Sequence, residues 1–175
     1  MTYADITAPA DDNINQGGSQ ATIYFAPVAD INTDSAIGTV TNPEDAYLLT
    51  TAVAMKTGKK AIPIDVVITS GTLEVEGIGE DEGMAFKLTP TFSIPGNNPK
   101  ALPLYNSPNG RFVFWLPLNN GKTIQVGSVK QPAYVKPNFS GGGTSGNGSF
   151  FQFTVESYQP TLKFYEAEIP TTPAA

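Results

Sequence analysis

Hydrophobic and polar residues alternate along several short stretches of the chain, which predicts β-strands. The longest such stretch spans residues 83–95. Its apolar positions are Met84, Phe86, Leu88, Phe92 and Ile94. Lysine, threonine and serine fill most of the positions between them, and this alternation is typical of a strand with one solvated face. The stretch 72–78 alternates too, and the turn sequence GEDEG (79–83) joins both into a predicted long hairpin.

The same alternation predicts further strands at 21–28, 61–69, 111–118, 122–129 and 149–157. The sequence NNG (119–121) has the composition of a tight turn, which predicts a second hairpin over 111–129.

Two segments begin with an Asn-Pro pair, which is a helix-start signal because asparagine caps the helix and proline suits its first turn. The first is 42–55, with Asn42 as the cap. Its second half, LLTTAV, fits a strand equally well. The second is 97–107, where Pro103 limits any helix to one or two turns.

Seven or eight strands with one or two short helices predict an all-β fold, an antiparallel β-sandwich or half-open barrel. We expect a single domain over residues 21–165. Residues 1–20 are polar and predict an N-terminal arm, and the proline-rich residues 166–175 predict a flexible C-terminal tail.

Composition excludes several classes of chemistry. The chain of 175 residues has a formal net charge of −6, and no dense Lys/Arg cluster that would grip nucleic acid. It contains no cysteine and no histidine, so a Ser-His-Asp triad, a thiolate metal site and a disulfide are all ruled out. The first residues do not predict a signal peptide, and no apolar run predicts a membrane span. We therefore expect a non-enzymatic protein made in a cytoplasm, without cofactor or metal.

The glycine-rich stretch GGGTSG (141–146) matches the pattern of a dinucleotide-binding loop. Such a loop must lead into a helix whose N-terminus holds the pyrophosphate. Here it leads into SFFQFTVES, which predicts a strand, so we interpret 138–148 as a flexible hairpin loop.

Acidic clusters offer two other candidates. Asp30, Asn32 and Asp34 have calcium-loop spacing, as do the polar residues 11, 13 and 15, but both clusters lack the glycine and the final acid of that motif. Glu74 and Glu76 share a strand face at about 6.5–7 Å, which is compatible with glycosidase carboxylates. Turn chemistry and solvated charge explain these acids more simply.

Aromatic residues suggest either an interface or a sugar platform. Trp115 alternates with Phe112 and Phe114, so its side chain is predicted on the opposite side of that strand. It could pack against another layer or another subunit, or stack on a sugar together with Tyr105 and Tyr134.

The order of these segments resembles the tail tube proteins of tailed bacteriophages over about residues 60–165. The resemblance is carried by EVEGIGEDEGMAFKLTPTFSIPG, RFVFWLPLNNGKTIQVGS and FFQFTVESYQP. It implies a subunit of hexameric rings that stack into a tube, with strands of all subunits lining a channel through which DNA passes without sequence-specific binding. It also implies contacts with other tail proteins and a place in the virion.

The resemblance assigns surfaces instead of catalytic residues. The lumen would be lined by Glu74, Glu76, Glu80, Asp81, Glu82, Lys87, Thr89 and Thr91. Contacts between subunits would involve Trp115, Gly142, Gly146 and Asn147. Acidic walls would repel DNA phosphates and let the DNA slide. Other candidate roles are a tail terminator, a decoration protein, an injection-system tube protein, or a carbohydrate-binding β-sandwich.

Overall fold

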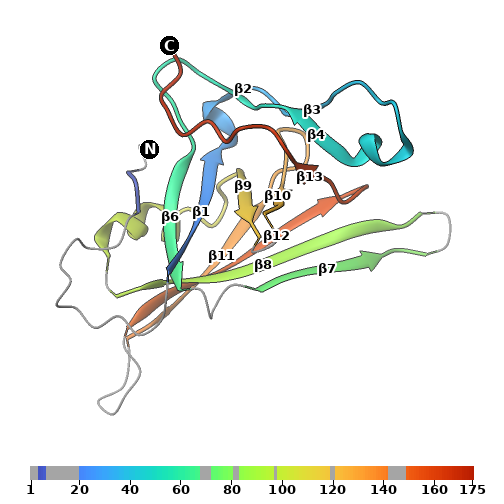
Figure 1. Cartoon of the computed structure of the whole chain (residues 1–175). Coiled ribbons are helices and arrows are strands. Elements are labelled where there is room, and N and C mark those ends of the chain that lie inside the picture. The colour runs from blue at the N-terminus through green and yellow to red at the C-terminus, as the bar shows by residue number, and fades with distance from the viewer. Residues whose placement is uncertain are drawn as a thin grey trace.

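Two β-sheets pack face to face, and a smaller third layer covers the outer side of the larger sheet (Figure 1). The computed structural model describes residues 4–6, 20–67, 72–80, 83–96, 98–118, 121–141 and 149–175. The predicted all-β fold with short helices is confirmed, since the named strands pair antiparallel everywhere except between β13 and β4.

The strands form sheets of seven, four and two strands. The larger sheet has the order β3 (Ala36–Ile37), β4 (Leu48–Thr51), β13 (Phe164–Tyr165), β10 (Thr123–Val126), β9 (Phe112–Pro117), β1 (Gln20–Pro27), β6 (Ile62–Val67). The smaller sheet has the order β11 (Tyr134–Ser140), β12 (Phe150–Gln159), β8 (Ala85–Pro95), β7 (Thr72–Ile78). A two-stranded sheet pairs β2 (Ile31–Thr33) with β5 (Ala54–Met55).

The main hydrophobic core lies between the seven-stranded and four-stranded sheets. Aromatic rings meet there across the two sheets: the centroids of Phe92 and Phe114 are 6.1 Å apart, and Phe92 stacks on Phe153 at 5.4 Å. Such ring pairs stabilise a core beyond the area that they bury. The alternation in 83–95 and 149–157 is thus confirmed: the apolar residues of β8 and β12 that face this core are buried, except for the partly buried Phe86. Met84, which directly precedes β8, is exposed.

A second core lies on the other face of the larger sheet, where Trp115 and Val113 are 0% exposed. Because Phe112 and Phe114 are buried on the first face, β9 is covered on both sides. The rings of Trp115 and Tyr165 pack edge to face with centroids 6.0 Å apart. Burial in this core raises the pKa of the Tyr165 hydroxyl. Trp115 therefore packs against another layer of its own chain. Its assignment to contacts between subunits is wrong, since a fully buried indole offers no surface to a partner.

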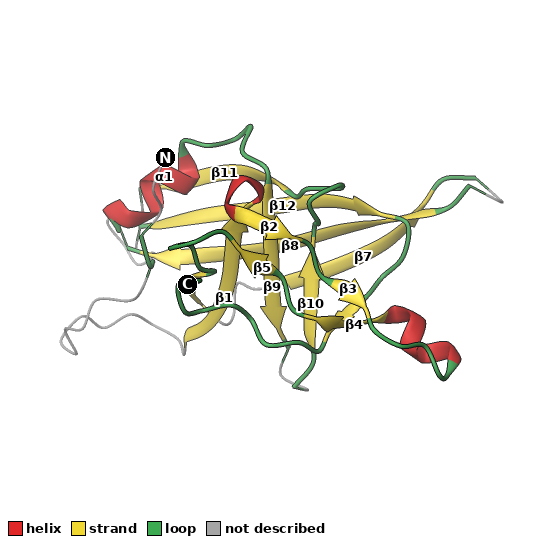
Figure 2. Cartoon of the chain, turned by 90° about the horizontal axis from the view of Figure 1, so that it is seen from above, coloured by secondary structure: helices red, strands yellow, loops and turns green. Residues whose placement is uncertain are grey.

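Both Asn-Pro segments form short helices (Figure 2). In the first, the 3₁₀ helix Pro43–Tyr47 leads directly into β4, so the helix and strand interpretations each hold for one half. Backbone N–H groups of Asn42 and Thr41 donate to the Asp45 carboxylate and lower its pKa. In the second, the 3₁₀ helix Pro99–Ala101 is followed by α1 (Leu102–Tyr105), which buries Leu104 in the main core. A further 3₁₀ turn, Val28–Asp30, follows β1.

The C-terminal segment belongs to the domain, which corrects the expected flexible tail at 166–175. It donates and accepts backbone hydrogen bonds along residues 58–61: Ala61 N to Pro170 O at 2.7 Å and Ala174 N to Lys59 O at 3.0 Å. Ile169 and Ala174 pack on the second core. In the expected N-terminal arm, Ile6 is 1% exposed and bridges to Ile64 of β6, so this part of the arm also docks on the sheet.

Candidate assembly surface

The outer face of the four-stranded sheet carries polar side chains and no covering layer of described residues. Residues directly opposite one another across strands share a face. The register places Thr72 beside Thr91, Glu74 beside Thr89 and Glu76 beside Lys87. On the next strand, Thr91 neighbours Thr154, which neighbours Lys136. The polar side chains of this outer face are Thr72, Glu74, Glu76, Lys87, Thr89, Thr91, Ser93, Gln152, Thr154, Glu156, Tyr158, Tyr134, Lys136, Asn138 and Ser140. Apolar residues share the face only at the ends of the sheet, where Ile78 pairs with Ala85 and Phe150 with Pro95.

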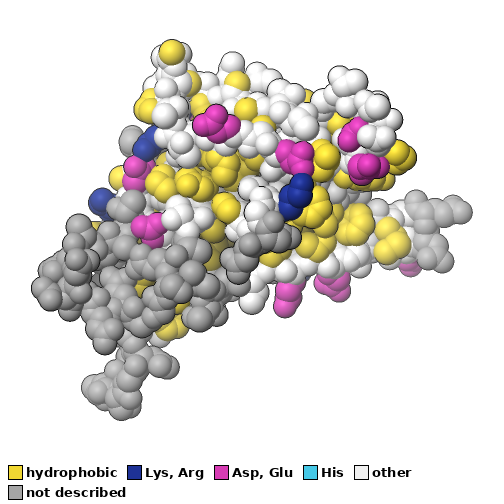
Figure 3. Space-filling view, viewed as in Figure 1, with side chains coloured by type: hydrophobic (Ala, Val, Ile, Leu, Met, Phe, Trp, Pro, Cys, Tyr) yellow, Lys and Arg dark blue, Asp and Glu magenta, His cyan; other side chains and the backbone are white. Residues whose placement is uncertain are grey.

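Five of the predicted lumen residues therefore lie together on one face: Glu74, Glu76, Lys87, Thr89 and Thr91. Glu80 lies in the turn beyond β7 and is exposed. Asp81 and Glu82 lie outside the described residues. Figure 3 shows acidic side chains projecting from the lower side of the molecule, where Figure 1 places β7 and β8. The register thus brings these members of the predicted set together on one face, as the alternation predicts.

Glu156 is the charged centre of the face and was not among the predicted site residues. Its carboxylate accepts from Lys136 Nζ at 2.7 Å and lies 3.5 Å from Lys87 Nζ. The hydrogen bond from Lys136 lowers the pKa of Glu156, and the same bond raises the pKa of Lys136. Both lysines of the face are thus paired with one acid. No ion pair forms at Glu74 or Glu76 within the described part of the chain, so the β7 side of the face stays negative.

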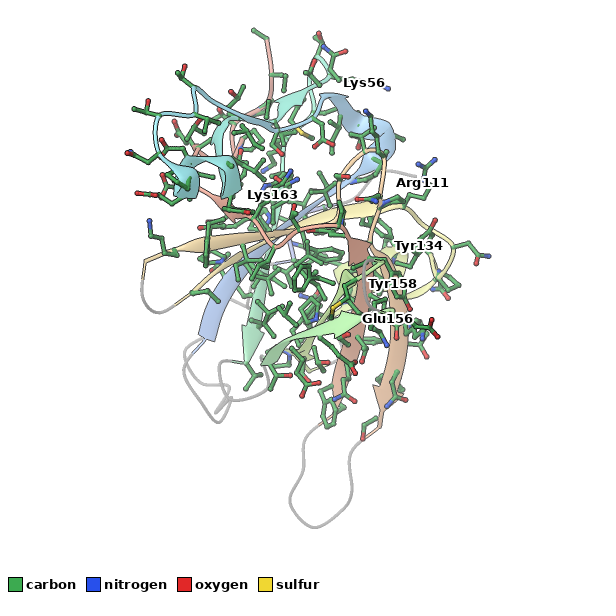
Figure 4. The ribbon with its side chains drawn as sticks, turned by 90° about the vertical axis from the view of Figure 1, so that its right-hand side faces the viewer. Lys56, Arg111, Tyr134, Glu156, Tyr158 and Lys163 are labelled. Carbon is green, nitrogen blue, oxygen red and sulfur yellow. The ribbon has the colours of Figure 1, made fainter. Side chains whose placement is uncertain are left out.

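Tyr134 lies opposite Glu156 and Tyr158 lies opposite Lys87, so both rings border one side of this ion-pair cluster (Figure 4). They are 45% and 50% exposed. Tyr134 was considered at the sequence level as a partner of Trp115 in a sugar platform. That platform does not exist, because Trp115 is buried on the far side of the larger sheet and Tyr105 packs against Phe151 in the main core.

The β7–β8 hairpin is apolar on its reverse side, and part of that side is uncovered. Val75 is 38% exposed and Met84 is 59% exposed near the hairpin end. Figure 1 shows the hairpin extending past the strands of the larger sheet, so the main core does not reach its tip. The predicted hairpin is confirmed, with Ile78 opposite Ala85 as its last pair.

The glycine-rich stretch joins two antiparallel strands. β11 and β12 pair from Tyr134–Glu156 to Ser140–Phe150, so the segment 141–149 connects a hairpin and leads into a strand. The dinucleotide-loop interpretation is therefore excluded, and residues 138–140 belong to β11. Gly142, Gly146 and Asn147, predicted to contact other subunits, lie outside the described residues.

The other acidic candidates have structural partners. Asp30 pairs with Lys59 at 3.2 Å, while Asp34 accepts backbone hydrogen bonds from Ser35 and Val129. In the ranges that the structure describes, no group of three acidic residues could hold a metal ion. The cluster at 11–15 lies outside those ranges. Glu74 and Glu76 stand on an open sheet surface, which does not provide the enclosed site of a glycosidase.

Comparisons with known proteins identify no relative: no family model, no curated protein and no solved structure matches the chain. Among the described helices, none has the length and apolar character needed to cross a membrane.

The Glu156 cluster predicts a defined pH dependence. A carboxyl whose pKa is depressed in the folded state stabilises the fold above its unfolded pKa, and this contribution is lost as the pH falls through the folded value. We expect Glu156→Gln to be less stable than the native chain near neutral pH by less than about 1 kcal/mol, because Lys136, which makes the shorter contact, has a side chain that is 67% exposed. The difference should be smaller at about pH 3, because the contribution begins to fall below the unfolded pKa of about 4.3 and is lost as the pH passes through the lowered folded value. Urea unfolding at both pH values measures it.

Glu74→Gln is the matched control, since it removes a carboxylate of the same face that has no ion pair among the described residues. It should follow the native chain at both pH values. A Glu156→Gln deficit that persists unchanged in acid would show that the ion pairs do not contribute.

Proposed function

We propose that this protein is a structural subunit that assembles into rings and stacks into the tube of a phage tail. The observation that carries the proposal is the four-stranded sheet, which has one polar face and two edge strands, β11 and β7, whose outer edges pair with no described strand. An edge strand exposes unpaired backbone N–H and C=O groups that can pair with another chain, and in β11 only Pro137 lacks the N–H. A head-to-tail contact between two different edges generates a closed ring when the rotation closes.

The even number of strands in this sheet favours closure of a ring through contacts between β7 and β11. Successive strands in the order β11, β12, β8, β7 run antiparallel, so β7 of one copy and β11 of the next also run antiparallel when the copies are related by rotation about the ring axis. Each copy would then add four strands to one continuous sheet. Six copies would make a hexameric ring, as the resemblance implies.

Charge favours the same pairing. The outer face bears Glu74 and Glu76 at the β7 edge and Lys136 at the β11 edge. Joining these edges would bring opposite charges together, which guides the register of association. The face carries three acids and two lysines, all named above, and Glu80 adds a further negative charge at the hairpin. A continuous wall with this balance would repel DNA phosphates and suit a conduit.

Negative-stain electron microscopy of the purified chain over a concentration series tests the proposal. We expect rings with a central hole that stack into tubes as the concentration rises. Single rings that never stack would indicate a terminator role. Monomers at every concentration, including in the presence of tail components that could initiate a tube, would contradict the proposal.

A further inference from the structure

A concave site lies on the other side of the molecule, between three connections of the chain. Its volume is about 670 Å³, which is within the range of small-molecule sites. It is lined by the turn after β2, by the connection from β10 to β11 and by the segment that follows β12. Gln125, which lines it, lies opposite Trp115 in the larger sheet and so shares the face turned away from the four-stranded sheet. The site is therefore separate from the outer face of the four-stranded sheet.

The wall of this cleft is built from buried amides. Gln125 is 4% exposed and is fixed by two hydrogen bonds: its Oε1 accepts from Ser35 Oγ at 2.9 Å and its Nε2 donates to Gly127 O at 3.0 Å. Gly127 has φ of 87° and lies so close to Ala133 and Phe112 that a Cβ would clash with their backbone. Only glycine lets the chain follow this path, so the wall is held in place by the fold.

Gln159 supplies the group that points to a ligand. It lines the cleft and is 9% exposed, yet its side-chain amide makes no hydrogen bond to any described residue. Its amide nitrogen and oxygen are not among the fully enclosed, unpartnered polar atoms of the described residues, so they keep contact with solvent and are available to a ligand.

Two lysines give the cleft a positive charge in an acidic protein. Lys130 and Lys163 line it, and neither forms an ion pair within the described residues. Figure 4 shows Lys163 between the upper layer and the strands below it. In a chain of net charge −6, two unpaired ammonium groups in a concavity concentrate a positive potential there.

The lining excludes other ligand classes. The single acid in the cleft, Asp34, has its two carboxylate oxygens occupied by the N–H groups of Ser35 and Val129, which disfavours a cation. No aromatic ring is found among the described lining residues, which removes the stacking surface that a nucleobase uses. Amides and hydroxyls both donate and accept, as sugar hydroxyls do, while ammonium groups match a carboxylate or phosphate.

We propose that this cleft binds a small hydroxyl-rich anion of the sugar-acid or sugar-phosphate class. Lys130 and Lys163 hold the anionic group, and Gln159 hydrogen-bonds the hydroxyls. Binding requires only the single chain, so the proposal stands or falls independently of ring assembly.

Isothermal titration calorimetry on the full chain tests it with D-glucuronate and D-glucose 6-phosphate as probes. We expect at least one of them to bind at least about tenfold more tightly than D-glucose and inorganic phosphate. Lys163→Met and Gln159→Leu should each weaken binding roughly tenfold, the effect of losing a hydrogen bond to a charged or buried partner. Lys100→Met is the control, because Lys100 lies in the 3₁₀ helix before α1 and does not line the cleft.

The binding results either support or overturn the proposed site. Binding of one probe alone supports the proposal and identifies the anionic group as carboxylate or phosphate. The proposal is overturned if neither probe binds, if inorganic phosphate binds as tightly as the sugars, or if Lys100→Met weakens binding as much as Lys163→Met. Far-ultraviolet circular dichroism of each variant confirms that the fold is retained.

Discussion

Replacing Trp115 by alanine should lower the free energy of unfolding by about 3–5 kcal/mol, the usual cost of deleting a large buried aromatic side chain. Trp115 is 0% exposed and contacts the ring of Tyr165 in the second core. Its loss would leave a cavity between the larger sheet and the layer formed by β2, β5 and the C-terminal segment. Because Trp115 is the single tryptophan of the chain, urea unfolding should be followed by circular dichroism and not by fluorescence.

Two further variants show whether the loss in the free energy of unfolding comes from packing. Trp115→Phe should be less damaging than Trp115→Ala, because it keeps a ring and removes an indole N–H that has no hydrogen-bond partner among the described residues. Tyr158→Ala removes an aromatic ring that is 50% exposed and should change stability by less than about 0.5 kcal/mol. A Trp115→Ala effect as small as that of Tyr158→Ala would mean that the second layer is not a packed core.

The position of Trp115 shows what the alternation of apolar and polar residues can predict and what it cannot. Alternation correctly placed Trp115 on the opposite side of β9 from Phe112 and Phe114. It could not say what covers that side, because the covering strands β2 and β5 are only three and two residues long and have no periodicity to detect. Their pairing joins residues about twenty positions apart, and the C-terminal segment that completes the layer is more distant still.

Strand β11 was missed for a different reason. Pro137 lies in its middle, and proline argues against a strand because it cannot donate to the ladder. The strand is an edge of the four-stranded sheet, which is where proline is tolerated. Glu156 falls within the predicted strand 149–157, but its pairing with Lys136 depends on the association of β11 with β12, so the charged centre of the outer face could not be predicted. The β7–β8 hairpin was predictable because its contacts are local.

Proline at one of two adjacent positions in β7 should strongly weaken ring formation without unfolding the subunit. Successive residues of a strand direct their N–H groups to opposite sides, so of Glu74 and Val75 one donates toward β8 and the other toward the free edge. Proline at the edge-facing position removes a donor needed for pairing with the next copy, and its ring obstructs the approach of that strand. We expect the concentration required for rings to rise at least roughly tenfold, while the urea midpoint stays near that of the native chain.

The alanine variants Glu74→Ala and Val75→Ala are the matched controls, because they remove the same side chains and keep the backbone N–H. Rings should persist with both alanines, require a higher concentration with the edge-facing proline, and be lost together with stability for the proline that breaks the β7–β8 ladder. Negative-stain electron microscopy and urea unfolding of the four variants distinguish these cases. If both proline variants still form rings at the same concentration as the native chain, the copies associate through another surface, even where the native protein makes tubes. If Glu74→Ala alone prevents assembly, the contact depends on side-chain charge across the β7 and β11 edges and not on backbone pairing.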